Sequence, residues 1–153
     1  MLTKQTLRAA SGWLELGMPE DALNELKHLS EEDREDRSAL ELRLAAEMAL
    51  RNWMDAAETA KLLCMEAIDE PNYFLSAAFC LHELGDTSGA KTWLQGGPET
   101  LSGMAVFHYN MACYLWTLGE SECARKHLNL AFEMDETFRD SARHDKDLVG
   151  MDL

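Results

Sequence analysis

The stretch YLWTLGESECARKHLNLAFEMD (114–135) decides the fold, because its arrangement occurs again elsewhere in the chain. It contains a Leu-Gly pair with an alanine five residues beyond the glycine. Nearly the same arrangement appears in LELGMPEDAL (14–23) and in HELGDTSGA (82–90). Internal repetition of this kind calls for a search for a fixed period before any local assignment.

The period is 34 residues, counted between equivalent positions. The turn positions that fall in register are Gly17, Arg51, Gly85 and Gly119. The alanines that follow them have the same spacing and are Ala22, Ala56, Ala90 and Ala124. A strict period of this length is typical of a helical solenoid.

Each repeat is interpreted as two helices joined by a turn. Apolar residues at helical spacing precede the turn at Ala77, Ala78 and Leu81, and others follow a later turn at Ala124 and Leu128. A glycine at the turn can adopt the left-handed backbone that ends the first helix without steric cost. We expect the recurrent alanine to let the two helices approach closely, because a bulky side chain there would force them apart.

The chain resembles a tetratricopeptide-repeat (TPR) array of the small bacterial type. The match is closest in the fourth repeat, at Tyr109-Asn110-Met111-Ala112 and at Leu118-Gly119. The resemblance implies an all-α fold, a right-handed α-solenoid of antiparallel helix pairs, with residues 1–153 as a single domain. The expected repeats are about 3–36, 37–70, 71–104 and 105–138, and the segment 138–153 is expected to cap the last one.

The second repeat departs from the family pattern. Arg51 replaces the turn glycine, and Arg43 and Glu47 stand where the family usually has buried apolar residues. We therefore expect its first helix to be rotated by about one residue. The rotation would turn three other residues inward: Leu44, Ala45 and Met48.

Three segments lie outside the regular pattern. Gly96-Gly97-Pro98 should shorten the second helix of the third repeat and leave a loop over 96–102. The acidic run SEEDREDRS (30–38) should be a solvated loop that leads into a helix. At the end of the chain, D-K-D-L (145–148) resembles the end of a TPR capping helix. The apolar residues expected to seal the stack there are Phe138, Ala142 and Leu148.

The resemblance implies that the first helices of successive repeats line a concave groove for an extended peptide or a partner helix. The groove positions carried over are Leu7, Ser11, Leu14, Met48, Phe79, His82, Tyr109, Cys113 and Trp116, with Glu41 and Ala45 completing the second repeat. Most of these side chains are apolar or aromatic, and tyrosine and tryptophan are frequent interface anchors. The family's clamp for the carboxyl terminus of heat-shock chaperones uses lysines, asparagines and arginine, which are missing at these sites.

Charge and composition limit the partners. The net charge of −14 opposes binding to phosphate backbones and to anionic lipid. No stretch is long and apolar enough to span a bilayer, and the first residues lack the apolar core of a signal peptide. The four cysteines have irregular spacings, which favours free thiols in a reducing compartment. We therefore expect a cytoplasmic protein.

The sequence contains no motif for phosphate binding, dinucleotide binding, zinc proteolysis or a serine nucleophile. His82 and Cys113 would face each other across the third and fourth repeats, as a thiol–imidazole pair, a soft metal site or a simple groove lining. The groove lining is the favoured interpretation. We expect no catalytic residue, cofactor or metal, and no enzymatic activity.

The leading functional hypothesis is a protein-interaction module that binds a peptide or helix of a partner in its groove. The acidic exterior favours a partner that is apolar or basic in character. Two alternatives stay open. One is a holding chaperone for a secreted or translocator-type protein, and the other is a structural module that self-associates, for example as a homodimer.

Overall fold

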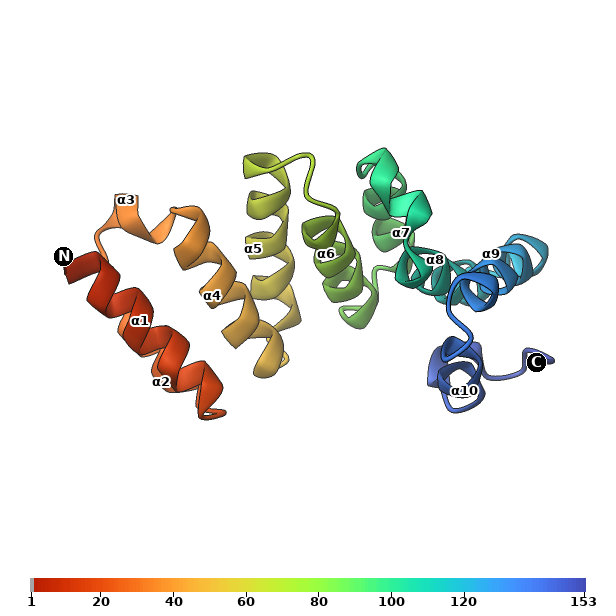
Figure 1. The fold of residues 1–153 in the computed structure, drawn as a ribbon, viewed down its shortest axis with the longest axis horizontal. Helices are drawn as coiled ribbons and strands as arrows, with labels where there is room; N and C mark the ends of the chain where they lie inside the picture. Colours follow the sequence, from red (N-terminus) through yellow and green to blue (C-terminus); the bar gives the residue numbers. More distant parts are fainter. Residues whose placement is uncertain (1) are drawn as a thin grey trace. The chain divides into compact units, whose positions relative to one another are not determined.

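The computed structural model describes residues 2–153, and this part of the chain contains helices and no strand. The long helices form consecutive pairs whose members pack against each other (Figure 1). The pairs are α1 (Leu2–Glu15) with α2 (Pro19–Leu26), α4 (Arg37–Ala49) with α5 (Trp53–Glu66), α6 (Pro71–Glu83) with α7 (Thr87–Gln95), and α8 (Ala105–Thr117) with α9 (Ser121–Met134). Shorter elements are α3 (Glu31–Arg34), η1 (Glu99–Gly103), α10 (Phe138–Arg143) and η2 (Lys146–Leu148), where η denotes a 3₁₀ helix. The expectation of an all-α fold is confirmed.

Contacts divide the chain into two units. Unit 1 ends at Ile68 and contains α1 to α5, and unit 2 is Asp69–Leu153 and contains the remaining elements. Within unit 1, α4 packs against α1 and α2 as well as against α5. Within unit 2, α8 packs against α6, α7 and η2 as well as against α9. A single domain and its solenoid arrangement stay predictions.

The four turn positions have the left-handed backbone that the repeat predicts. Their φ angles are 72° at Gly17, 58° at Arg51, 97° at Gly85 and 82° at Gly119. After α8, the N–H of Gly119 donates to the carbonyl of Trp116 (3.1 Å) and the N–H of Glu120 donates to that of Leu115 (2.8 Å). Equivalent bonds follow α1, α4 and α6. This is the Schellman arrangement, which satisfies carbonyls left free at a helix end.

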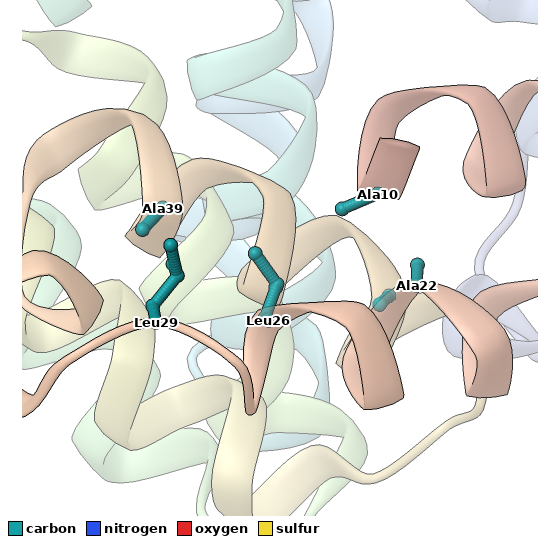
Figure 2. Packing of buried hydrophobic residues seen from close by; sticks show 6 residues of the cluster. Ala10, Ala22, Leu26, Leu29 and Ala39 are labelled. Carbon is teal, nitrogen blue, oxygen red and sulfur yellow. The ribbon is translucent and has the colours of Figure 1, made fainter. Parts of the chain in front are cut away.

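The recurrent alanines lie in the contact between paired helices. Each is 0% exposed: Ala22, Ala56, Ala90 and Ala124. Figure 2 shows this packing in unit 1, where Ala10 of α1 and Ala22 of α2 belong to one buried cluster. Leu26 and Leu29 extend the cluster to Ala39 of α4. The small side chains therefore allow the close approach that the sequence predicts.

The expected rotation of α4 is only partly correct. Leu44 is buried and Met48 is half-buried, as expected, but Ala45 is exposed. Glu47 is 7% exposed and Arg43 is half-buried, so both charged residues keep the inward positions of the repeat. The helix therefore accommodates polar side chains in its packed interface instead of turning them to solvent.

A threonine on α5 explains how α4 buries this charge. The Thr59 hydroxyl donates to Oε2 of Glu47 (2.7 Å), and Nη2 of Arg43 donates to the same hydroxyl oxygen (2.9 Å). Nε of Arg43 also lies 3.3 Å from Oε1 of Glu47. Burial raises the pKa of Glu47, whereas the Thr59 hydrogen bond and the Arg43 charge oppose that rise.

The irregular segments follow the sequence expectations in outline. Helix α7 ends at Gln95 after nine residues, and the expected loop over 96–102 contains the start of η1 at Glu99. The acidic segment 30–38 is exposed and contains a single helical turn, α3. Ser30 begins that turn because its side chain accepts from the N–H of Asp33 (3.1 Å).

No helix within residues 2–153 combines the length and the apolar character that crossing a membrane requires.

Candidate peptide-binding face

Four of the expected groove residues lie close together in unit 2. His82 is in the last turn of α6. Tyr109, Cys113 and Trp116 lie on α8 at spacings of four and three residues, which places them on one face of that helix. Tyr109 and Cys113 are buried, and His82 and Trp116 are half-buried. We call these four residues the α6–α8 face.

Residues 138–153, here called the C-terminal segment, cover this face. The segment consists of α10, η2 and an irregular end. Asp145 begins η2 because its Oδ1 accepts from the N–H of Asp147 (2.9 Å). Leu148 is 2% exposed and Ala142 is 2% exposed, which confirms their expected burial.

Asp145 contacts two of the groove residues through one oxygen. The phenol of Tyr109 donates to its Oδ2 at 2.6 Å, and the thiol of Cys113 lies 3.8 Å from the same atom. Burial is the main cause that raises the pKa of both Tyr109 and Cys113, and the charge of Asp145 adds to each rise. The Cys113 thiol is therefore protonated at neutral pH, which makes it a poor nucleophile.

Asp147 contacts the imidazole that the other helix supplies. Nε2 of His82 lies 3.1 Å from Oδ2 of Asp147, and Nδ1 of the same ring lies 2.9 Å from the Thr87 hydroxyl. Both ring nitrogens therefore have a partner within hydrogen-bond distance. Lys146, between the two aspartates, is largely exposed and lies 3.8 Å from Glu83.

Aromatic side chains hold the two ends of the C-terminal segment. Phe138 stacks on Tyr109, with ring centroids 4.8 Å apart. At the other end, the indole N–H of Trp116 donates to the carbonyl of Val149 (3.1 Å). Gly150 follows with a φ of 88°, and a Cβ built there would lie 3.9 Å from the Trp116 ring. The four residues of the face thus contact the segment along its length.

The other expected groove residues are arranged differently. Phe79 lies on α6 and is 38% exposed. In unit 1, Leu7 and Leu14 are half-buried and pack against the hydrophobic cluster of Figure 2. Ser11 on α1 and Met48 on α4 are also half-buried. Leu7 and Leu14 therefore contribute to the core of unit 1 as well as to its surface.

Asp145 and Asp147 were not among the residues predicted from the sequence for this site. The structure places Asp145 next to Cys113 and Asp147 next to His82. The D-K-D-L pattern was a usable signal, since it marked a capping segment. It did not indicate which helix face the cap would cover.

A second polar cluster in unit 2 lies on α8 and α9. Nε2 of His108 lies 2.8 Å from the carbonyl of Ser102, so this nitrogen donates. Nδ1 of His108 then accepts from Nδ1 of His127, 3.0 Å away. Burial is the main cause that lowers the pKa of His127, and the neighbouring His108 contributes. Burial therefore disfavours the protonated form of His127 in the folded unit.

Comparisons with protein-family models and with curated proteins find no match for this chain.

Proposed function

We propose that this chain is a protein-interaction module of the TPR type, whose first helices bind a peptide segment of a partner. The 34-residue repeat supports the family assignment, because the same left-handed turn and the same buried alanine recur at each repeat. The proposed architecture is a right-handed solenoid of antiparallel helix pairs. In it, α1, α4, α6 and α8 are the first helices.

One observation carries the binding proposal: residues 138–153 of the same chain already contact the α6–α8 face. Tyr109, His82 and Trp116 contact two carboxylates and a backbone carbonyl of that segment. These three side chains offer O–H and N–H donors, and they are anchored on helices rather than on loops. The face therefore has the chemistry to recognise a peptide by its acceptors.

We infer the chemistry of the partner from these donors rather than from the net charge. An overall charge of −14 favours an apolar or basic partner, but the donors of the face fit carboxylates. The segment seated there has the pattern Asp-x-Asp-Leu, in which the leucine is buried. We propose a partner segment with two acidic residues followed by an apolar one, which would compete with residues 145–148.

A labelled synthetic peptide of residues 138–153 tests this proposal in trans. In the full chain, the Asp145→Ala/Asp147→Ala variant removes the contacts of these two carboxylates with Tyr109 and His82. The α6–α8 face should then be more accessible to the peptide. We expect this variant to bind the peptide at least about tenfold more tightly than the unaltered chain, as measured by fluorescence polarisation. Adding Trp116→Ala should abolish the gain while leaving the circular dichroism of the helices unchanged.

The matched control is the same peptide with both aspartates replaced by asparagine. It should bind the opened variant at least about tenfold more weakly, because the charge-assisted hydrogen bonds are lost. If the opened variant binds neither peptide, the face is a structural contact only and the proposed function is wrong.

A further inference from the structure

The contact between the C-terminal segment and the α6–α8 face brings together four side chains that can bind a metal ion. The Sγ of Cys113 and one carboxylate oxygen each from Asp145 and Asp147 all lie within 4.8 Å of one another. Nε2 of His82 lies 3.1 Å from Oδ2 of Asp147. We call these four residues the His–Cys–Asp cluster.

Two separations between ligand atoms of the cluster can be compared with those around a tetrahedral ion. Zinc bonds of 2.0–2.3 Å place neighbouring ligand atoms about 3.3–3.8 Å apart. The observed separations are 3.8 Å between Cys113 Sγ and Asp145 Oδ2, and 3.1 Å between His82 Nε2 and Asp147 Oδ2. The first separation lies within this range and the second is slightly shorter. Because the ligand atoms that all lie within 4.8 Å of one another are those of Cys113, Asp145 and Asp147, the His82 imidazole would have to move toward Cys113 and Asp145 to complete the site.

The charges of the cluster also favour a cation. Two carboxylates face a buried thiol, and His82 can contribute at most one positive charge to balance them. The side chains of His82 and Asp147 are 9% and 24% exposed, so solvent screens this repulsion only in part. A divalent ion would neutralise both carboxylates and would also stabilise the Cys113 thiolate.

Neighbouring groups hold the ligands in suitable orientations. In the ion-bound form, Nδ1 of His82 would donate to the Thr87 hydroxyl, 2.9 Å away, and the Nε2 lone pair would bind the ion instead of Nε2 donating to Asp147. Tyr109 donates to Asp145, and the N–H of Asp147 donates to the other oxygen of the same carboxylate. Such hydrogen bonds to the ligating groups are typical of metal sites in proteins.

From this geometry we propose that His82, Cys113, Asp145 and Asp147 bind a divalent ion of the zinc type. A set of imidazole, thiolate and carboxylate ligands suits Zn²⁺ better than Mg²⁺ or Ca²⁺, which prefer oxygen alone. On binding, the Cys113 thiol releases its proton to solvent, and a sulfur–metal bond replaces the S–H bond. All four positions are filled by protein, so the ion fastens the C-terminal segment to α6 and α8 rather than acting on a substrate.

Cobalt replaces zinc as a visible probe of the full-length protein. We expect chelator-treated protein to bind Co²⁺ with a thiolate-to-metal charge-transfer band in the near ultraviolet, and Zn²⁺ to remove that band by displacement. The Cys113→Ala variant should lose the band completely. Asp147→Asn, which keeps the side-chain shape, should weaken Co²⁺ binding at least about tenfold.

Two control variants test whether the signal comes from this cluster. Cys123→Ser removes the exposed thiol, and His127→Gln disrupts the other histidine pair. Both should keep the band. In thermal melts, Zn²⁺ should raise the Tm of the unaltered chain but not that of Cys113→Ala. The proposal is wrong if the unaltered protein shows no charge-transfer band, or if the band persists in Cys113→Ala.

Discussion

The phenol of Tyr109 donates a 2.6 Å hydrogen bond to Asp145, which lies 36 residues further along the chain. This bond joins a position of the expected groove to the segment expected to be a cap. The segment expected to cap unit 2 therefore covers the helix face that was expected to bind a partner. A contact of this kind can be tested by removing a single oxygen atom.

Tyr109→Phe removes the hydrogen bond to Asp145 but keeps the aromatic ring that stacks on Phe138. Because the acceptor is a carboxylate, we expect the free energy of unfolding to fall by about 1.5–3 kcal/mol. Urea unfolding followed by circular dichroism measures this change. Limited proteolysis should also cut the C-terminal segment of the variant more quickly.

Tyr114→Phe is the matched control on the same helix. The Tyr114 hydroxyl is buried and has no hydrogen-bond partner among the described residues. Removing it should leave stability unchanged or raise it, because an unsatisfied buried hydroxyl is costly. Equal destabilisation by both substitutions would show that the Tyr109–Asp145 bond contributes nothing specific.

The helix pairs could be predicted from the sequence because their determinants are local. A left-handed turn at Gly17, Gly85 or Gly119 needs a residue without a Cβ, and the period of 34 follows from counting. Local determinants did not predict the inward positions of Arg43 and Glu47. Their burial depends on Thr59, a residue of another helix whose hydroxyl carries no signal in the sequence pattern.

The candidate site could be predicted only in part for a similar reason. Helical spacing was enough to group Tyr109, Cys113 and Trp116 on one face of α8. No periodicity relates that face to Asp145 and Asp147, because irregular backbone separates them from the helices. Contacts between a helix and an irregular segment depend on three-dimensional packing, which a single sequence does not specify.

The turn at Arg51 is strained. Arg51 has a φ of 58°, and it is the one residue within 2–153 that has a positive φ without being glycine. A left-handed backbone costs a residue with a Cβ about 1–2 kcal/mol, so Arg51→Gly should stabilise the protein by about 1 kcal/mol. The shift of the urea midpoint of unfolding measures this gain in stability.

The reciprocal control is Gly85→Ala. An added Cβ there would meet nothing within 4 Å, so any loss of stability reflects backbone strain alone. Destabilisation by Arg51→Gly would contradict this account.

The His108–His127 pair should make stability depend on pH. Burial lowers the pKa of His127 below the ordinary value of 6.5, so the unfolded chain binds a proton more readily at this residue. The stability contribution is complete above that value and is lost as the pH falls through the folded-state pKa. Urea midpoints measured from about pH 8 to pH 5 should therefore decline on the acidic side.

His127→Gln should remove most of this decline, because the titrating group is gone. His28→Gln is the control, since the His28 side chain is 71% exposed. That variant should keep the acidic decline of the unaltered chain. A decline of equal size in His127→Gln would assign the effect to other groups.

The Arg43–Glu47–Thr59 cluster allows a test of how the charge of Glu47 is stabilised inside unit 1. Arg43→Met keeps much of the side-chain volume but leaves the Glu47 carboxylate, only 7% exposed, without its cation. Removing one partner of a buried pair costs about 3–5 kcal/mol, and the partial exposure of Arg43 favours the lower end.

Because the pKa of Glu47 is already raised, the Arg43→Met variant should regain stability as the pH falls and the carboxyl group becomes neutral. Arg43→Met/Glu47→Leu should recover most of the loss at neutral pH. A persistent loss would assign the effect to packing instead of charge.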